Sequence, residues 1–109
     1  MKISDLIKEL GLKVITKTDY EDREVSGCYI GDLLSWVMSK ASADNIWITV
    51  QTNINIVAVA TLTDVSCVLI PDGIEVEGTT IEMANKKGVV ILGSVSDSFS
   101  LAVAVSKML

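Results

Sequence analysis

Polar residues and glycines gather where apolar segments of this sequence give way to turns, and these residues could bind a ligand. Their amide, hydroxyl and carboxylate groups suit hydrogen bonds to a polar small molecule. Unpaired N–H groups at the start of a following helix could hold an anion. The candidate ligand-binding residues are Gly31, Asp32, Gln51, Thr52, Asn53, Asp72, Gly73, Ser94 and Ser96.

Helix capping is the alternative role for the same side chains. Thr52 or Asn53 could cap the helix that follows them, and Ser96 with Asp97 could cap the last helix of the chain. Asp32 could stabilise a helix dipole instead of binding a ligand. The sequence leaves both roles open, and the turn that contains Thr52 and Asn53 is the most informative place to look for a ligand.

Catalytic chemistry is restricted by what the chain lacks. It contains no histidine, the commonest general base and metal ligand, so no Ser-His-Asp or Cys-His arrangement can form within it. Cys28 and Cys67 lie far apart in apolar surroundings, which indicates buried, reduced thiols and no metal site. The glycine-spaced segment 88–95 lacks the lysine of a nucleotide-binding P-loop. We expect no catalytic residue, no metal and no cofactor.

Asp22, Arg23 and Trp36 are candidates for a turn or a partner contact. The first two lie in the charged stretch 18–24, where they would form either a local solvated ion pair or a contact to another protein. Trp36 lies off the apolar stripe of its helix, so we predict that it packs against a second subunit.

Composition limits the partners of the chain. The formal net charge is −5, with 9 basic and 14 acidic residues, which argues against nucleic acid and anionic membranes as partners. Hydrophobic residues make up 50% and the mean hydropathy is +0.49, so we expect a homodimer or a higher homo-oligomer that covers the excess apolar surface. Asp5, Lys8 and Glu9 interrupt any signal-peptide core, and no apolar run could span a membrane, which favours a cytoplasmic protein.

Hydrophobic periodicity predicts alternating strands and helices in one domain, 1–109. Short apolar runs indicate strands at 13–16, 25–30, 46–50, 67–70 and 89–92. Helical spacing indicates helices near 3–10, 31–41, 53–65, 79–87 and 96–108. Ser4 and Thr79 would cap the first and fourth helices, and Gly11 and Gly88 would end them. The alternation predicts a three-layer α/β/α sandwich around a mostly parallel sheet of four to five strands.

Several stretches resemble a known family in their order and pattern. The second half contains Cys67-Val-Leu-Ile-Pro-Asp-Gly-Ile-Glu, then Thr80-Ile-Glu-Met-Ala-Asn-Lys-Lys-Gly-Val-Val-Ile-Leu, then Ser96-Asp-Ser-Phe. The first half contains Asp22-Arg-Glu-Val-Ser-Gly, Gly31-Asp-Leu-Leu and Asp44-Asn-Ile-Trp-Ile-Thr. Together they resemble the DRTGG domain and, equally, the N-terminal domain of bifunctional HPr kinase/phosphorylase.

The resemblance implies a domain that is attached to catalytic or CBS domains and regulates them. Most of the residues that give the DRTGG domain its name are missing, because the two strand ends read Gln51-Thr52-Asn53 and Ile70-Pro71-Asp72-Gly73. The P-loop kinase domain of the HPr kinases is absent as well. We expect a stand-alone regulatory or ligand-binding module, without catalytic activity, that senses a small nucleotide-like or anionic ligand or regulates a partner enzyme.

Two alternatives remain open. One is a small transferase or hydrolase that depends on carboxylates, with Asp72 or Asp97 as the base. It would show a deep pocket at the strand ends and a carboxylate with a raised pKa. The other is a structural subunit of a larger complex, which would show a flat apolar face and no pocket.

Overall fold

Short apolar segments form a central sheet, and the segments between them form helices that cover both of its faces. The computed structural model describes all 109 residues. The strands are β1 (Lys13–Val14), β2 (Gly27–Ile30), β3 (Asn45–Ile48), β4 (Cys67–Ile70) and β5 (Ile91–Gly93). The helices are α1 (Ile3–Leu10), α2 (Leu34–Lys40), α3 (Asn55–Thr63), α4 (Gly78–Lys87) and α5 (Ser98–Met108).

The sheet has the strand order β1-β5-β4-β3-β2. The strands β2 to β5 run parallel to their neighbours, while β1 pairs antiparallel with β5 at one edge. Every residue of β4 is buried, and so is every residue of β3 after Asn45. Continuous burial of this kind is typical of strands that are covered on both faces. The predicted mostly parallel sheet is confirmed, with five strands.

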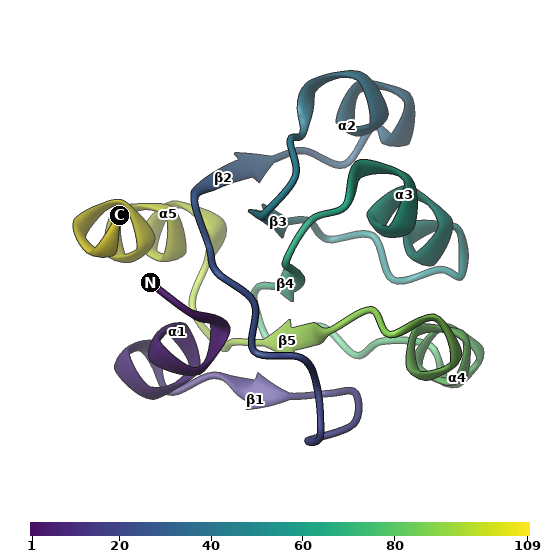
Figure 1. The fold of residues 1–109 in the computed structure, drawn as a ribbon, viewed down its shortest axis with the longest axis horizontal. Coiled ribbons are helices and arrows are strands. Elements are labelled where there is room, and N and C mark those ends of the chain that lie inside the picture. The colour runs from purple at the N-terminus through teal and green to yellow at the C-terminus, as the bar shows by residue number, and fades with distance from the viewer.

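The helices form one layer on each face of the sheet (Figure 1). On one face, α2, α3 and α4 lie side by side and contribute Val37, Ile56 and Ala84 to a buried cluster. On the other face, α1 and α5 contribute Leu6 and Leu101 to a second buried cluster. The expected three-layer α/β/α sandwich is therefore confirmed.

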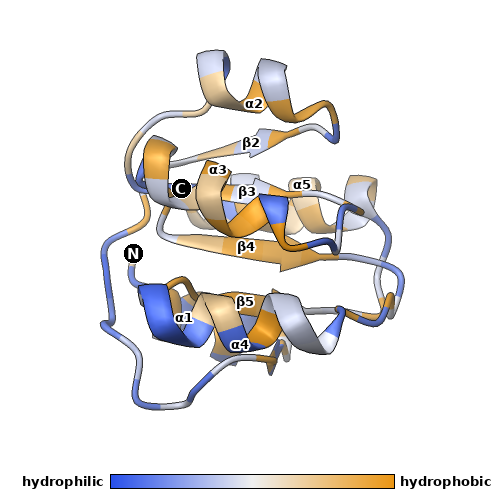
Figure 2. Cartoon of the chain, turned by 90° about the vertical axis from the view of Figure 1, so that its right-hand side faces the viewer, coloured by the Kyte–Doolittle hydropathy of each residue, from blue (hydrophilic) through white to orange (hydrophobic).

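Helix α3 differs from an ordinary surface helix because apolar residues surround most of its circumference (Figure 2). Its nine residues include no charged side chain. Ile56 and Val57 are buried, whereas Leu62 is 70% exposed and Ile54, just before the helix, is 42% exposed. A solvated helical face normally carries polar residues, so the outer surface of α3 is unusually apolar. No helix of the structure is both long enough and apolar enough to cross a membrane.

The helix ends agree with the sequence at one terminus and differ at the other. Gly11 and Gly88 end α1 and α4 with φ values of 60° and 71°, in the left-handed region that glycine adopts without strain, so both predicted stops are confirmed. The N-caps predicted for α1 and α4 are wrong. Ser4 is the second residue of α1, and Thr79 is the second residue of α4, which begins at Gly78 without a side-chain cap.

The start of α1 is capped from a distant part of the chain. The Asp22 carboxylate accepts hydrogen bonds from the Ser4 hydroxyl at 2.6 Å and from the Ser4 N–H at 2.8 Å, and these bonds hold the pKa of Asp22 below its usual value. The Asp5 carboxylate accepts a bond from the Lys2 N–H at 2.8 Å. Two carboxylates thus lie at the positive end of the helix dipole, where negative charge is stabilising. A cap that comes from 18 residues away replaces the local cap that the sequence predicted.

We predict that Asp22→Asn destabilises the fold at neutral pH and not in acid. Folding lowers this pKa, so the carboxylate stabilises the protein above its unfolded pKa, and this contribution is lost as the pH falls through the folded value. Urea titrations should give a difference in unfolding free energy of about 0.5–1 kcal/mol at pH 7, comparable to other helix caps, and almost none at about pH 2. Asp19→Asn, at an exposed carboxylate without a hydrogen bond, is the control. An equal difference at both pH values would contradict the capping role.

Candidate ligand-binding site

All nine candidate ligand-binding residues lie at the same edge of the sheet. Because β2 to β5 are parallel, the turns that follow them meet at the carboxyl edge, where open α/β sheets bind their ligands. The residues form two separate groups along this edge. One group follows β2 and β3, and the other follows β4 and β5.

Asp32 joins the ends of β2 and β3. Its carboxylate accepts hydrogen bonds from the Thr49 hydroxyl at 2.8 Å and from the Val50 N–H at 2.9 Å. The predicted helix opening at Gly31 and Asp32 is wrong by a few residues, since α2 begins at Leu34. The helix starts later because the Asp32 carboxylate is hydrogen-bonded to the segment after β3. These bonds hold the ends of β2 and β3 together.

The segment Gln51-Thr52-Asn53 is held by bonds within the chain. The Gln51 side-chain amide donates to the Asp32 carbonyl at 2.9 Å, and the Asn53 amide donates to the Gln51 side-chain oxygen at 3.0 Å. The Asn53 side-chain oxygen accepts from the Asn55 N–H at 2.9 Å, but the N-cap of α3 is Ile54, so the capping role predicted for Thr52 or Asn53 is wrong. The Thr52 carbonyl accepts from the Thr80 hydroxyl at 2.8 Å. The hydrogen-bonding groups named here thus already have partners, and a ligand role for the segment stays a prediction.

Gly31 is required by close packing. A Cβ atom at this position would lie 2.9 Å from a ring carbon of Tyr29. The Gly31 carbonyl also accepts a 2.8 Å bond from the indole N–H of the buried Trp47. These contacts explain a glycine at this position without a ligand.

The second group consists of two turns that bond to each other. The Asp72 N–H donates to the Ser96 carbonyl at 2.9 Å, and the Gly73 N–H donates to the Ser94 carbonyl at 2.8 Å. Asp72 and Gly73 have φ values of 59° and 63°, so two consecutive residues adopt the left-handed region to make the turn. Asp97 caps α5 by accepting the Ser100 N–H at 2.7 Å, as one of the sequence alternatives predicted.

A crevice, called the β4–β5 crevice below, lies beside the turns that follow β4 and β5, and the end of α1 and β1 also line it. The helix after β4 covers one face of the sheet and the helix after β5 covers the other (Figure 1), and such a divergence is where open α/β sheets bind their ligands. The cavity has a volume of about 540 Å³, within the usual range for small-molecule sites. Its lining includes three candidate residues, Gly73, Ser94 and Ser96.

The crevice also contains residues that the sequence analysis did not single out. Lys13 comes from β1 and Leu10 from the end of α1, while Glu75 follows the β4 turn. Neither Lys13 nor Glu75 forms an ion pair within the chain. Lys13 reaches the crevice because β1 pairs antiparallel with β5, in a register that sets Lys13 opposite Gly93. The sequence analysis missed these residues because nothing in the first helix or in the short edge strand indicated a binding site.

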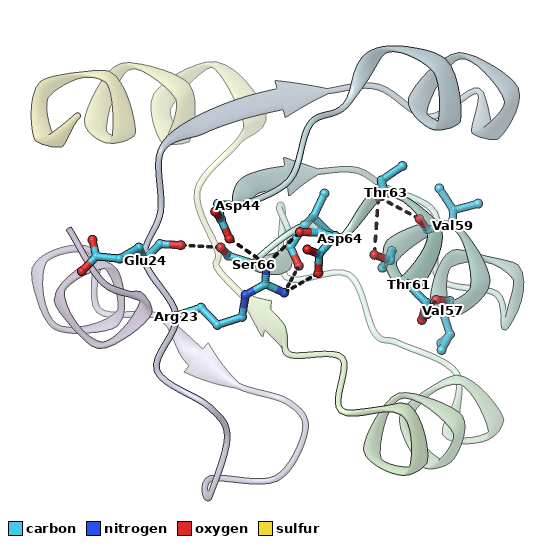
Figure 3. Close-up of polar contacts among 11 residues, drawn as sticks. Arg23, Glu24, Asp44, Val57, Val59, Thr61, Thr63, Asp64 and Ser66 are labelled. Atoms are coloured by element: carbon cyan, nitrogen blue, oxygen red, sulfur yellow. Dashed lines mark hydrogen bonds and ion pairs between the residues drawn. The ribbon is translucent and has the colours of Figure 1, made fainter.

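Arg23 lies at the opposite, amino edge of the sheet and joins two loops (Figure 3). Its guanidinium donates to the Asp44 carboxylate at 2.7 Å and to the Asp64 carboxylate at 3.0 Å. It also donates to the carbonyls of Asp64 at 2.9 Å and of Val65 at 3.2 Å. Burial alone would lower the pKa of Arg23, but the two carboxylates raise it on balance. The predicted local ion pair with Asp22 is therefore wrong. Arg23 has a structural role, because it joins the loops that contain Asp44 and Asp64.

The two cysteines and Trp36 lie outside the lining of the crevice. Burial raises the pKa of the Cys28 thiol to about 11 and that of Cys67 to about 12, so neither is a thiolate at neutral pH. The structure brings together no group of three His, Cys, Asp or Glu side chains that could hold a metal ion. Trp36 is 57% exposed, and the Lys40 ammonium lies 5.7 Å from its ring centre.

Comparison with known proteins identifies a family and a similar solved structure. The fold resembles a crystal structure of the CBS and DRTGG domains of the regulatory region of Clostridium perfringens pyrophosphatase, complexed with its activator diadenosine tetraphosphate. The TM-score is 0.74 at 15% sequence identity, and the match covers 98% of this chain and 46% of that one, so this chain spans about half of its neighbour. No curated protein matches the sequence. The model of the DRTGG domain matches residues 5–108, and this chain therefore belongs to the DRTGG domain family.

Proposed function

We propose that this chain is a regulatory module that binds a small polar ligand in the β4–β5 crevice and controls a partner enzyme. The observation that carries the proposal is the crevice itself, which lies where the chain diverges and presents charged groups without an ion-pair partner. The similar pyrophosphatase region is regulatory and was crystallised with an activator, which supports a ligand-sensing role for this chain as well.

The same observations argue against the two alternatives. A general base needs a raised pKa, but the Ser100 N–H and hydroxyl contacts lower the pKa of Asp97, which is fully exposed. A purely structural subunit would have no crevice at the strand ends. We therefore favour a module without catalytic activity. The likeness to the N-terminal domain of HPr kinase/phosphorylase stays a prediction.

A screen with a blocking variant tests the ligand site. Ser96 lines the crevice and its hydroxyl makes no hydrogen bond, so Ser96→Phe would fill the space without removing a bond. Nucleotides form one arm of the screen, because the sequence predicts a nucleotide-like or anionic ligand. Amino acids and other metabolites form the second arm. Melting temperature is the measurement.

We predict that at least one compound raises the melting temperature of the wild type by several degrees. At a concentration about 100-fold above Kd, binding contributes about 2.7 kcal/mol to stability. Ser96→Phe should abolish this shift, while Ser35→Phe, on the exposed face of α2, should keep it. A ligand that binds Ser96→Phe as well as the wild type would place the site elsewhere.

The apolar outer face of α3 supports a homodimer or a higher homo-oligomer. Ile54, Ala58 and Leu62 follow one another at four-residue spacing, so they form one exposed stripe. The hydroxyls of Thr61 and Thr63 donate back to the helix carbonyls at 2.8 Å and need no other partner (Figure 3). Two such stripes are self-complementary when the helices pack antiparallel, because the dipole ends of opposite sign then meet. We assign this face to a second copy of the chain.

Leu62→Glu should dissociate that assembly without unfolding the protomer. Leu62 is 70% exposed, so a charge there costs little in the monomer but would be buried without a partner in the dimer. Light scattering after size exclusion should show the mass of one chain for Leu62→Glu and a multiple of it for the wild type. Trp36→Ala tests the contribution of α2 in the same way, and Thr18→Glu is the control at an exposed loop. A wild type that is itself monomeric would refute the assembly.

We also place the protein in the cytoplasm, without nucleic acid or membrane partners. The free thiols of Cys28 and Cys67 suit a reducing compartment. The net charge of −5 disfavours contact with phosphate backbones, and the single arginine is already committed to Asp44 and Asp64.

A further inference from the structure

We infer that the ligand of the β4–β5 crevice is a small zwitterion with an aliphatic side chain, namely a free amino acid such as leucine or a short peptide with both termini free. This inference rests on the proposed function, since it names the chemical class of the ligand for the same crevice. Three features of the cavity support it: its charged residues, its aliphatic side chains and its hydrogen-bond donors.

The charged residues of the lining balance each other. Lys13 is its one cation and Glu75 its one anion, and neither has an ion-pair partner in the chain. They come from different elements, Lys13 from β1 and Glu75 from the turn after β4. A zwitterion offers a counter-charge to each group, with its carboxylate for Lys13 and its ammonium for Glu75. A ligand of one sign would leave one of the two charges unmatched.

The wall of the crevice is aliphatic. Its apolar side chains are those of Leu10, Ile15, Ile74, Val76, Ile81 and Val95, and no aromatic residue lines it. Aliphatic walls suit a branched alkyl chain, because its burial needs only apolar contact area. A nucleobase is usually held by stacking on an aromatic ring, which the lining does not offer.

The lining of the crevice also includes hydrogen-bond donors that have no partner within the chain. The Ser96 hydroxyl makes no bond within the chain, and the backbone N–H of Val95 donates none. Both residues line the cavity next to Ser94. Such neutral donors suit a carboxylate of single charge in cooperation with one lysine. A polyphosphate would meet one cation only, with Asp72 and Asp97 in the adjacent turns as further negative charges.

Calorimetric titration of the full chain with five compounds tests the class of ligand. Leucine and leucyl-leucine carry both charges, N-acetyl-leucine lacks the ammonium, leucine amide lacks the carboxylate, and AMP is the nucleotide. We expect binding of leucine or leucyl-leucine, and a loss of affinity of at least about tenfold when either charge is removed from the ligand that binds. If leucine binds more tightly than leucyl-leucine, the ligand is a free amino acid, and if leucyl-leucine binds more tightly, the ligand is a short peptide.

Variants of the two charged residues then assign each contact. Lys13→Ala should weaken the zwitterion about tenfold or more and leave the amide unchanged, whereas Glu75→Ala should weaken the zwitterion and leave the N-acetyl compound unchanged. Lys86→Ala and Glu82→Ala, both on the exposed side of α4 and outside the crevice, are the matched controls.

The results separate this inference from the proposed function. One possible result is that AMP binds, the zwitterions do not, and Ser96→Phe abolishes the binding of AMP. This result would overturn the class of ligand and support the crevice as the site. If N-acetyl-leucine and leucine amide bound as tightly as leucine, the assignment of the two charges would be overturned. If no compound of any class in the wider screen stabilised the protein, the ligand-sensing function would fall together with the inference.

Discussion

The handedness of strand crossovers is the constraint on which this structure depends. Parallel strands joined by a helix connect in the right-handed sense, and β2, β3, β4 and β5 are added in one direction across the sheet. The helices between them, α2, α3 and α4, must therefore lie on one face. Only α5, which leads to no further strand, is free to cross to the other face and pack beside α1. The single divergence is therefore between β4 and β5, and the crevice lies beside the turns that follow these two strands.

The other strand ends are closed by bonds within the chain. At the carboxyl edge, Asp32 ties the end of β2 to the segment after β3. At the amino edge, Arg23 ties the loops that enter β3 and β4 through Asp44 and Asp64. The first tie satisfies the hydroxyl of the buried Thr49, and the second satisfies the half-buried guanidinium of Arg23, and both groups would be costly to bury without a partner. In the crevice, by contrast, the Lys13 and Glu75 side chains and the Ser96 hydroxyl have no partner within the chain, so they remain available to a ligand.

Local patterns were sufficient to predict the elements, the sheet and the glycine stops, because burial periodicity and backbone conformation depend on neighbouring residues. They failed where a contact comes from far along the chain. Asp22 caps α1 from 18 residues away, and Arg23 reaches Asp64 across 41 residues. Lys13 enters the crevice only because β1 is antiparallel to β5. The candidate turns were predicted in the right places, but sequence alone could not tell which of their hydrogen-bonding groups were already used.

Regulation requires that ligand binding changes the surface that meets a partner, and a ligand can do so only by its difference in affinity between two states. Helix α4 offers a physical connection for such a change. Ile81 lines the crevice, and the neighbouring Thr80, fully buried, donates its hydroxyl to the Thr52 carbonyl in the segment that leads to α3. A ligand that shifts the first turn of α4 therefore acts on the start of α3. Since the outer face of α3 is the proposed contact between copies, ligand binding and assembly would be coupled, and each would strengthen or weaken the other by the same factor.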